Sequence, residues 1–157
     1  MEEIENENCV KQWNSFGSGC SIVKADIAKE TNFNIAFEHG FGEDKDYGMQ
    51  LRNKGFDVLY NPDAKLLHLK APVGGFRNST EKLWDVDKIK SKPAPTVMLN
   101  RITNNTKHQL LGYKTTLFFK YYQDQKIKNP FIYFNYFKKE WRRSVYWATI
   151  LKEQNKT

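Results

Sequence analysis

The sequence has few cysteines, no long apolar run and no basic, apolar N-terminus. Its two cysteines, Cys9 and Cys20, are too few for a disulfide framework and lack the spacing of metal ligands, which fits a reducing compartment. No stretch reaches the roughly 18 apolar residues that a membrane-spanning helix needs. The N-terminus is acidic, so no secretory signal peptide is predicted. These absences favour a cytoplasmic protein.

Several motif classes are also missing. We find no internal repeat, no phosphate-binding loop around Gly17 and Gly19, and no nucleic-acid-binding signature. A calcium loop is excluded because Asp44-Lys45-Asp46 is not followed by the Gly and Glu that such a loop requires. The remaining signals are charge, aromatic content and one ordered set of residues.

Charge and aromatic residues are concentrated towards the C-terminus. Residues 120–157 hold nine Lys/Arg and three Asp/Glu, a net charge of +6, whereas residues 1–119 hold sixteen and fifteen, or +1. Twelve of the 23 aromatic residues lie between Phe118 and Trp147. This composition is typical of segments that contact an anionic membrane or a nucleic acid, and equally of packed helices with solvated basic faces.

The pattern of turns and apolar residues predicts an α/β chain. Short strands are expected within residues 16–23, 58–60 and 64–69. Helices are expected over residues 25–30, 43–54, 78–90 and 107–123, and from Pro130 onward. In the last helix one face should be apolar and buried; its members are Phe134, Phe137, Trp141, Val145 and Ala148.

One ordered set of residues lies between Gly17 and Arg77. It consists of Gly17-Ser18-Gly19-Cys20-Ser21-Ile22-Val23-Lys24, Phe33, Phe37, Gly42-Glu43-Asp44-Lys45-Asp46-Tyr47, Leu51-Arg52, Gly55, Tyr60-Asn61-Pro62, His68 and Gly74-Gly75-Phe76-Arg77. This order resembles the second half of the catalytic domain of family 2 glycosyltransferases. In that family a small-residue strand precedes a Glu-Asp helix, and a strand, a Pro and a His follow it.

The resemblance implies a partial nucleotide-diphospho-sugar transferase (A-type) fold, in which a fragment of a mixed sheet is followed by C-terminal α-helices. We expect a flexible acidic N-terminus over residues 1–15, the C-terminal half of the catalytic domain over residues 16–92, and a basic, aromatic helical region over residues 93–157. The implied activity is transfer of a sugar from a nucleotide-sugar to an acceptor hydroxyl, with inversion, in the synthesis of a cell-surface polysaccharide or glycoconjugate.

Asp44 is the expected catalytic base. Such a transfer needs a group that takes the proton of the acceptor hydroxyl, and a carboxylate at a helix N-terminus is held in the ionised form that can do so. Glu43 and His39 are expected to bind the acceptor, and Asp46 and Arg52 to support the helix, either by pairing with each other or by holding its first turn. The alternative is that these acids only cap a surface helix.

A second group of candidate residues follows the Glu-Asp helix in the sequence. The resemblance implies that His68 ligates a divalent cation, Mn²⁺ or Mg²⁺, and that Gly74, Gly75 and Arg77 form a lid or contact a phosphate. A strand His and a simple turn are the alternatives. Asn34 departs from the family, which often has Asp there, and this weakens any inference about the acceptor.

The donor half of the family is not represented. No Asp-x-Asp motif precedes the Glu-Asp helix, and Asp85-Val86-Asp87 comes too late in the chain. We therefore expect a fragment that is inactive alone, and an inactive remnant or interaction module is the alternative. A nucleic-acid-binding module would leave the ordered set unexplained, so no nucleic acid is expected.

The expected partners are a nucleotide-sugar donor and a sugar or lipid-linked acceptor. Residues 118–151 are expected to make peripheral contact with the inner face of the cell membrane, because basic and aromatic side chains alternate there.

Overall fold

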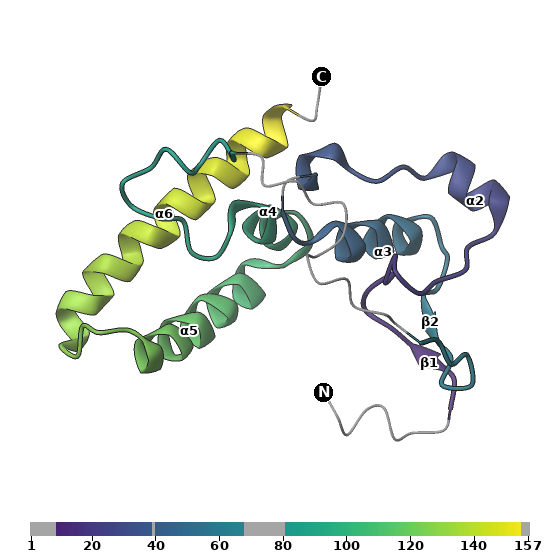
Figure 1. Ribbon diagram of the computed structural model, residues 1–157, viewed down its shortest axis with the longest axis horizontal. Coiled ribbons are helices and arrows are strands. Elements are labelled where there is room, and N and C mark those ends of the chain that lie inside the picture. Colours follow the sequence, from purple (N-terminus) through teal and green to yellow (C-terminus); the bar gives the residue numbers. More distant parts are fainter. Residues whose placement is uncertain (1–8, 39, 68–80, 155–157) are drawn as a thin grey trace. The chain divides into compact units, whose positions relative to one another are not determined.

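The computed structural model describes residues 9–38, 40–67 and 81–154. These residues are mostly helical, with one two-stranded sheet (Figure 1). The α/β prediction is therefore met only loosely, since the described strands form no mixed sheet. The chain divides into two compact units, one drawn from Met1–Asn34 and Glu43–Ser79 and the other from Ile35–Gly42 and Thr80–Thr157.

The first unit is organised around helix α3 (Glu43–Asn53). Acidic residues in its first turn favour initiation, because negative charge is stabilised at a helix N-terminus. The helix ends where Gly55 adopts a φ of +85°, a conformation that glycine reaches without strain. Tyr47 and Leu51 are buried, as their spacing predicts, and Val58 completes this small core.

A short antiparallel sheet and helix α2 (Ala25–Glu30) complete the first unit. Strand β1 (Lys11–Gln12) pairs with β2 (Leu59–Tyr60), with Lys11 opposite Tyr60. A turn follows β2, in which the backbone N–H of Asp63 donates to the side chain of Asn61 at 3.0 Å. Helices α2 and α3 and strand β2 all form where the sequence places them.

Two strand predictions in the first unit are wrong. Within residues 16–23, Gly17 has a φ of +68° and closes a turn by accepting from the N–H of Cys20, but no strand follows. The side chain of Ile22 is fully exposed at 100%, so burial of this side chain does not favour a strand. Residues 64–67 are also irregular, and residues 68–69 lie outside the described residues.

The second unit contains the 3₁₀ turn η1 (Ile35–Phe37) and the helices α4 (Pro95–Asn104), α5 (Lys107–Asp124) and α6 (Pro130–Gln154). Thr106 and Gln109 form a reciprocal capping box at the start of α5. The side chain of Asn129 caps α6 by accepting from two backbone N–H groups. Helix α4 is missing from the helices that the sequence predicts, because prolines usually interrupt a helix, whereas Pro95 occupies a first-turn position.

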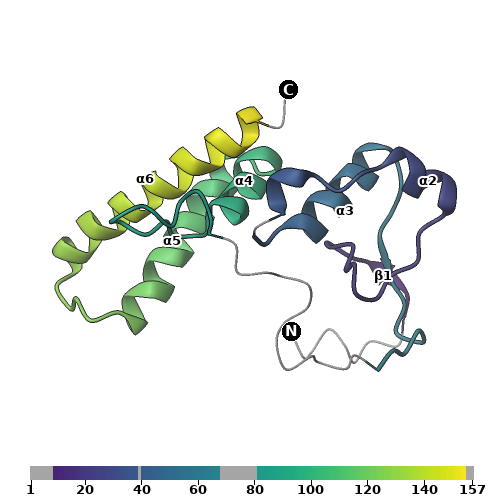
Figure 2. The ribbon, with the colours of Figure 1, turned by 45° about the horizontal axis from the view of Figure 1, so that its top comes forward.

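Helix α6 packs against α4, α5 and η1 (Figures 1 and 2). Of the predicted apolar face, Phe137, Trp141 and Ala148 are buried, as expected. Phe134 is not, since half of its side chain (50%) is exposed, while Tyr133 is 2% exposed. The buried face therefore begins one residue earlier than the apolar spacing indicates.

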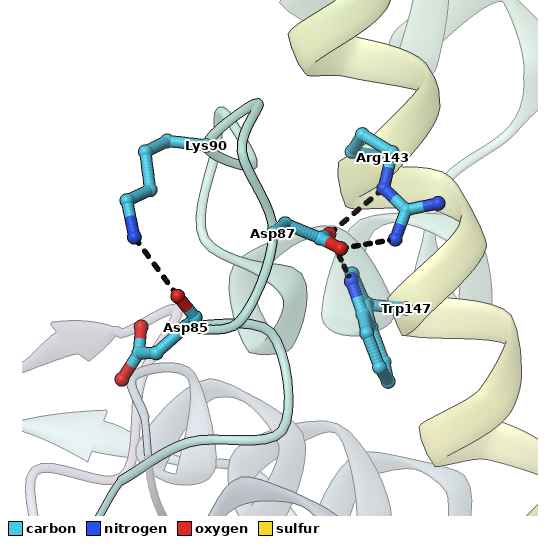
Figure 3. A network of polar contacts seen from close by, with 5 residues as sticks. All are labelled: Asp85, Asp87, Lys90, Arg143 and Trp147. Atoms are coloured by element: carbon cyan, nitrogen blue, oxygen red, sulfur yellow. Dashed lines mark hydrogen bonds and ion pairs between the residues drawn. The ribbon is translucent and has the colours of Figure 1, made fainter.

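The helix predicted over residues 78–90 does not form in its described part, residues 81–90. Asp85 accepts from the backbone N–H of Lys82 at 3.1 Å and so closes a turn instead. Asp87 binds α6, where its Oδ2 accepts from Arg143 Nε at 2.8 Å and from Trp147 Nε1 at 2.6 Å (Figure 3). These two hydrogen bonds lower the pKa of the Asp87 carboxyl. Asp85 thus closes a local turn, and Asp87 holds this segment on α6.

Glu140 is a buried acid on the packed face of α6. Its side chain is 2% exposed, and Oε1 lies 3.3 Å from Lys92 Nζ. Burial raises the pKa of Glu140, although the ammonium group of Lys92 partly opposes this. One turn later on α6, the hydroxyl of Ser144 donates to the carbonyl oxygen of Pro93 at 2.6 Å, which is a second contact between α6 and the Lys92–Pro93 segment.

A Glu140→Gln variant should remove a pH dependence of stability. Because the pKa of Glu140 is raised on folding, its contribution to the free energy of unfolding is fully present below the unfolded pKa and is lost as pH rises through the folded pKa. Urea unfolding of both proteins across mildly acidic to neutral pH should show the variant gaining stability relative to wild type as pH rises. An unchanged difference across that range would contradict the assignment.

Among the described residues, none of the helices combines the length and apolar character that crossing a membrane requires.

Candidate functional site

The candidate site lies at the N-terminus of α3 in the first unit. Asp44 makes two contacts with the segment that precedes α2. Its Oδ1 accepts from the backbone N–H of Ser18 at 3.1 Å, and its carbonyl oxygen accepts from the N–H of Phe16 at 3.1 Å. Two parts of the ordered set that are 26 residues apart in sequence are therefore in direct contact.

Gly48 allows this close approach. A Cβ atom added at Gly48 would lie 3.3 Å from the backbone nitrogen of Phe16 and 3.7 Å from the backbone of Ser15. A side chain here would push the Ser15–Phe16 segment away from α3. The glycine therefore fits a position where another backbone runs across the helix, one turn after Asp44.

Asp46 and Arg52 support α3 but do not pair with each other. The buried carboxylate of Asp46 accepts from Gln50 Nε2 at 2.9 Å, within the helix. Arg52 donates to the carbonyl oxygen of Trp13, directly after β1, and lies 3.5 Å from the sulfur of Met49. The supporting role that the sequence predicts is thus divided, with Asp46 acting inside α3 and Arg52 joining α3 to the end of β1.

Asp44 is half-buried, and one oxygen of its carboxylate is held by Ser18. Its Oδ2 makes no hydrogen bond among the described residues, so this oxygen can accept a proton or hydrogen bond from a bound hydroxyl. Glu43 is also half-buried and directly precedes it. The geometry therefore allows either general-base chemistry or simple capping of the helix.

Several predicted site residues cannot be placed in this geometry. His39, His68, Gly74, Gly75 and Arg77 lie outside the described residues. Within the described part of the chain, no three His, Cys, Asp or Glu side chains converge as a metal site would require.

Ser18 is a site residue to which the sequence assigned no role. Its contribution comes from its backbone N–H, which is presented to Asp44 by the turn that begins at Gly17. The flanking glycines, Gly17 and Gly19, indicate a turn at this position. They do not reveal the contact with Asp44, because a backbone N–H can make it whatever the side chain is.

Comparison with known proteins adds no relative, since no family model, curated protein or solved structure matches this chain. The functional assignment therefore depends on the ordered residues and on the geometry at α3.

Proposed function

We propose that this chain is the acceptor-activating part of an inverting glycosyltransferase that resembles family 2. The supporting observation is the contact between Ser18 N and Asp44 Oδ1 at 3.1 Å, which joins the small-residue turn to the Glu-Asp helix. The proposal includes the fold, namely that the chain forms part of an A-type transferase domain.

In this proposal, Asp44 Oδ2 takes the proton of an acceptor hydroxyl. The hydroxyl oxygen forms a bond to the anomeric carbon of the donor sugar, and the bond from that carbon to the diphosphate breaks. Its electron pair leaves with the nucleoside diphosphate, and the proton stays on Asp44. Ser18 fixes the orientation of the carboxylate, which is the positioning that general-base catalysis requires.

Only the resemblance to family 2 glycosyltransferases implies that a divalent cation takes part in the reaction. Mg²⁺ and Mn²⁺ prefer carboxylate oxygens, and the described residues do not converge on such a ligand set. His68, the proposed ligand, lies outside the described residues. We therefore assign no step of the mechanism to a cation.

The proposal is tested by a transfer assay. The chain is incubated with a panel of nucleotide-sugars, Mn²⁺ or Mg²⁺, and simple glycoside acceptors, and extended glycosides are detected by mass spectrometry. The assay is repeated with the chain fused to a donor-binding segment that carries Asp-x-Asp. Product in either format supports the proposal. No product in both formats, with a folded protein, contradicts it and favours an interaction module.

A further inference from the structure

We propose that the α5–α6 tip, defined as residues 118–139, docks on an anionic lipid surface. The tip comprises the end of α5, the connection to α6 and the first turns of α6. Figures 1 and 2 show these helices meeting through that short connection. This inference concerns the second unit and does not depend on the proposed transferase activity.

Large apolar side chains of the tip face solvent. Phe131 is the most exposed of them, at 79%, and it lies on the second residue of α6. The others are at least half exposed; they are Phe119, Ile132 and Phe134. Burying side chains of this size in an apolar phase is strongly favourable, so their exposure together at one end of a helical hairpin needs a partner.

The apolar side chains of the tip belong to one group. Phe118 joins the two helices, because its ring centroid lies 5.4 Å from that of Phe119 and 6.1 Å from that of Phe134. Phe131 and Phe134 are three residues apart on α6 and share a side of the helix. The aromatic side chains of both helices thus form one surface rather than isolated exposed residues.

Basic residues surround this surface. The tip carries five lysines and one acid, Asp124, so its net charge is +4. The lysines are all exposed; they are Lys120, Lys126, Lys128, Lys138 and Lys139. Long lysine side chains can reach anionic headgroups while phenyl rings enter the acyl boundary, as in other interfacial helices.

The charge also distinguishes between possible occupants. A second copy of the chain would bring two tips of charge +4 together, which is unfavourable. A nucleic acid matches the charge, but stacking on bases uses aromatic rings and leaves Ile132 unexplained. An anionic membrane accommodates the positive charge, the rings and the aliphatic side chain together.

The test is co-sedimentation of the full chain with vesicles of phosphatidylcholine alone and of phosphatidylcholine mixed with phosphatidylglycerol. We expect binding to the anionic vesicles at low salt, a marked loss at high salt, and weak binding to neutral vesicles. Lys128→Glu should weaken binding about tenfold, from the electrostatic contribution of a lysine near the surface. Phe131→Ser should weaken it by at least about tenfold, from the lost apolar burial.

Matched controls lie outside the tip. Leu111→Ser changes an exposed apolar residue of α5, and Lys152→Glu reverses an exposed charge in the last turn of α6. Both should bind like wild type. All of these positions are exposed, so circular dichroism should show every variant folded.

Three results would overturn the proposal. The first is no binding to anionic vesicles at low salt, and the second is an equal loss in tip and control variants. The third is that the tip binds something else. The chain would then bind RNA or DNA more tightly than vesicles, or form a dimer at higher concentration, and the tip variants would abolish that interaction.

Discussion

An Asp44→Asn variant is expected to transfer sugar about 10²–10⁴-fold more slowly than wild type, the range that a positioned general base contributes. Asparagine keeps the oxygen that accepts from Ser18 N, so the contact that holds the site can persist. What the variant loses is the basic oxygen that would take the acceptor proton. The measurement is the initial rate of glycoside extension in whichever assay format gives product.

Asp57→Asn is the matched control for this loss. Asp57 belongs to the same unit, and its Oδ1 accepts from Gln12 Nε2 at 2.7 Å, a bond that asparagine can also accept. Each substitution therefore replaces a carboxylate by an amide and keeps the one hydrogen bond that the side-chain oxygen accepts. Equal rates in the two variants would show that the charge of Asp44 has no role in transfer.

Phe137→Ala should cost about 3–5 kcal/mol of unfolding free energy, the usual result of removing a buried phenylalanine. Phe137 is 1% exposed, and its ring centroid lies 5.5 Å from that of Phe118 and 6.1 Å from those of Tyr133 and Trp141. Since domains are stable by only about 5–15 kcal/mol, this loss is a large share of the total. Urea unfolding, followed by circular dichroism, measures it.

Phe131→Ala provides the comparison within the same helix. The substitution is the same, but Phe131 faces solvent, so Phe131→Ala should change the free energy of unfolding by no more than about 0.5 kcal/mol. If the two variants lose similar amounts, Phe137 does not lie in the core described above.

Local signals predicted the helices well where the helix ends are set by nearby residues. Gly55 ends α3, Thr106 caps α5, and Asn129-Pro130 begins α6, all within one turn of the helix concerned. Such caps act over three or four residues, so they can be recognised from sequence alone.

The helix predicted over residues 78–90 illustrates a long-range effect that local patterns do not show. Asp87 forms no part of a helix because its partners, Arg143 and Trp147, are more than fifty residues away. The buried Glu140 likewise pairs with Lys92, which is also distant in sequence. At the candidate site, the position of α3 could be predicted, but the Ser18–Asp44 contact could not, because no local pattern encodes it.

We expect acceptor sugars to bind beside Asp44 at the N-terminus of α3. Titration of ¹⁵N-labelled protein with simple glycosides, followed by amide chemical shifts, tests this directly. We expect the largest chemical-shift changes at the amides of Ser18, Glu43 and Asp44, and weaker glycoside binding by the Asp44→Asn variant. Unchanged shifts at these amides with every glycoside, or changes confined to α5 and α6, would contradict it.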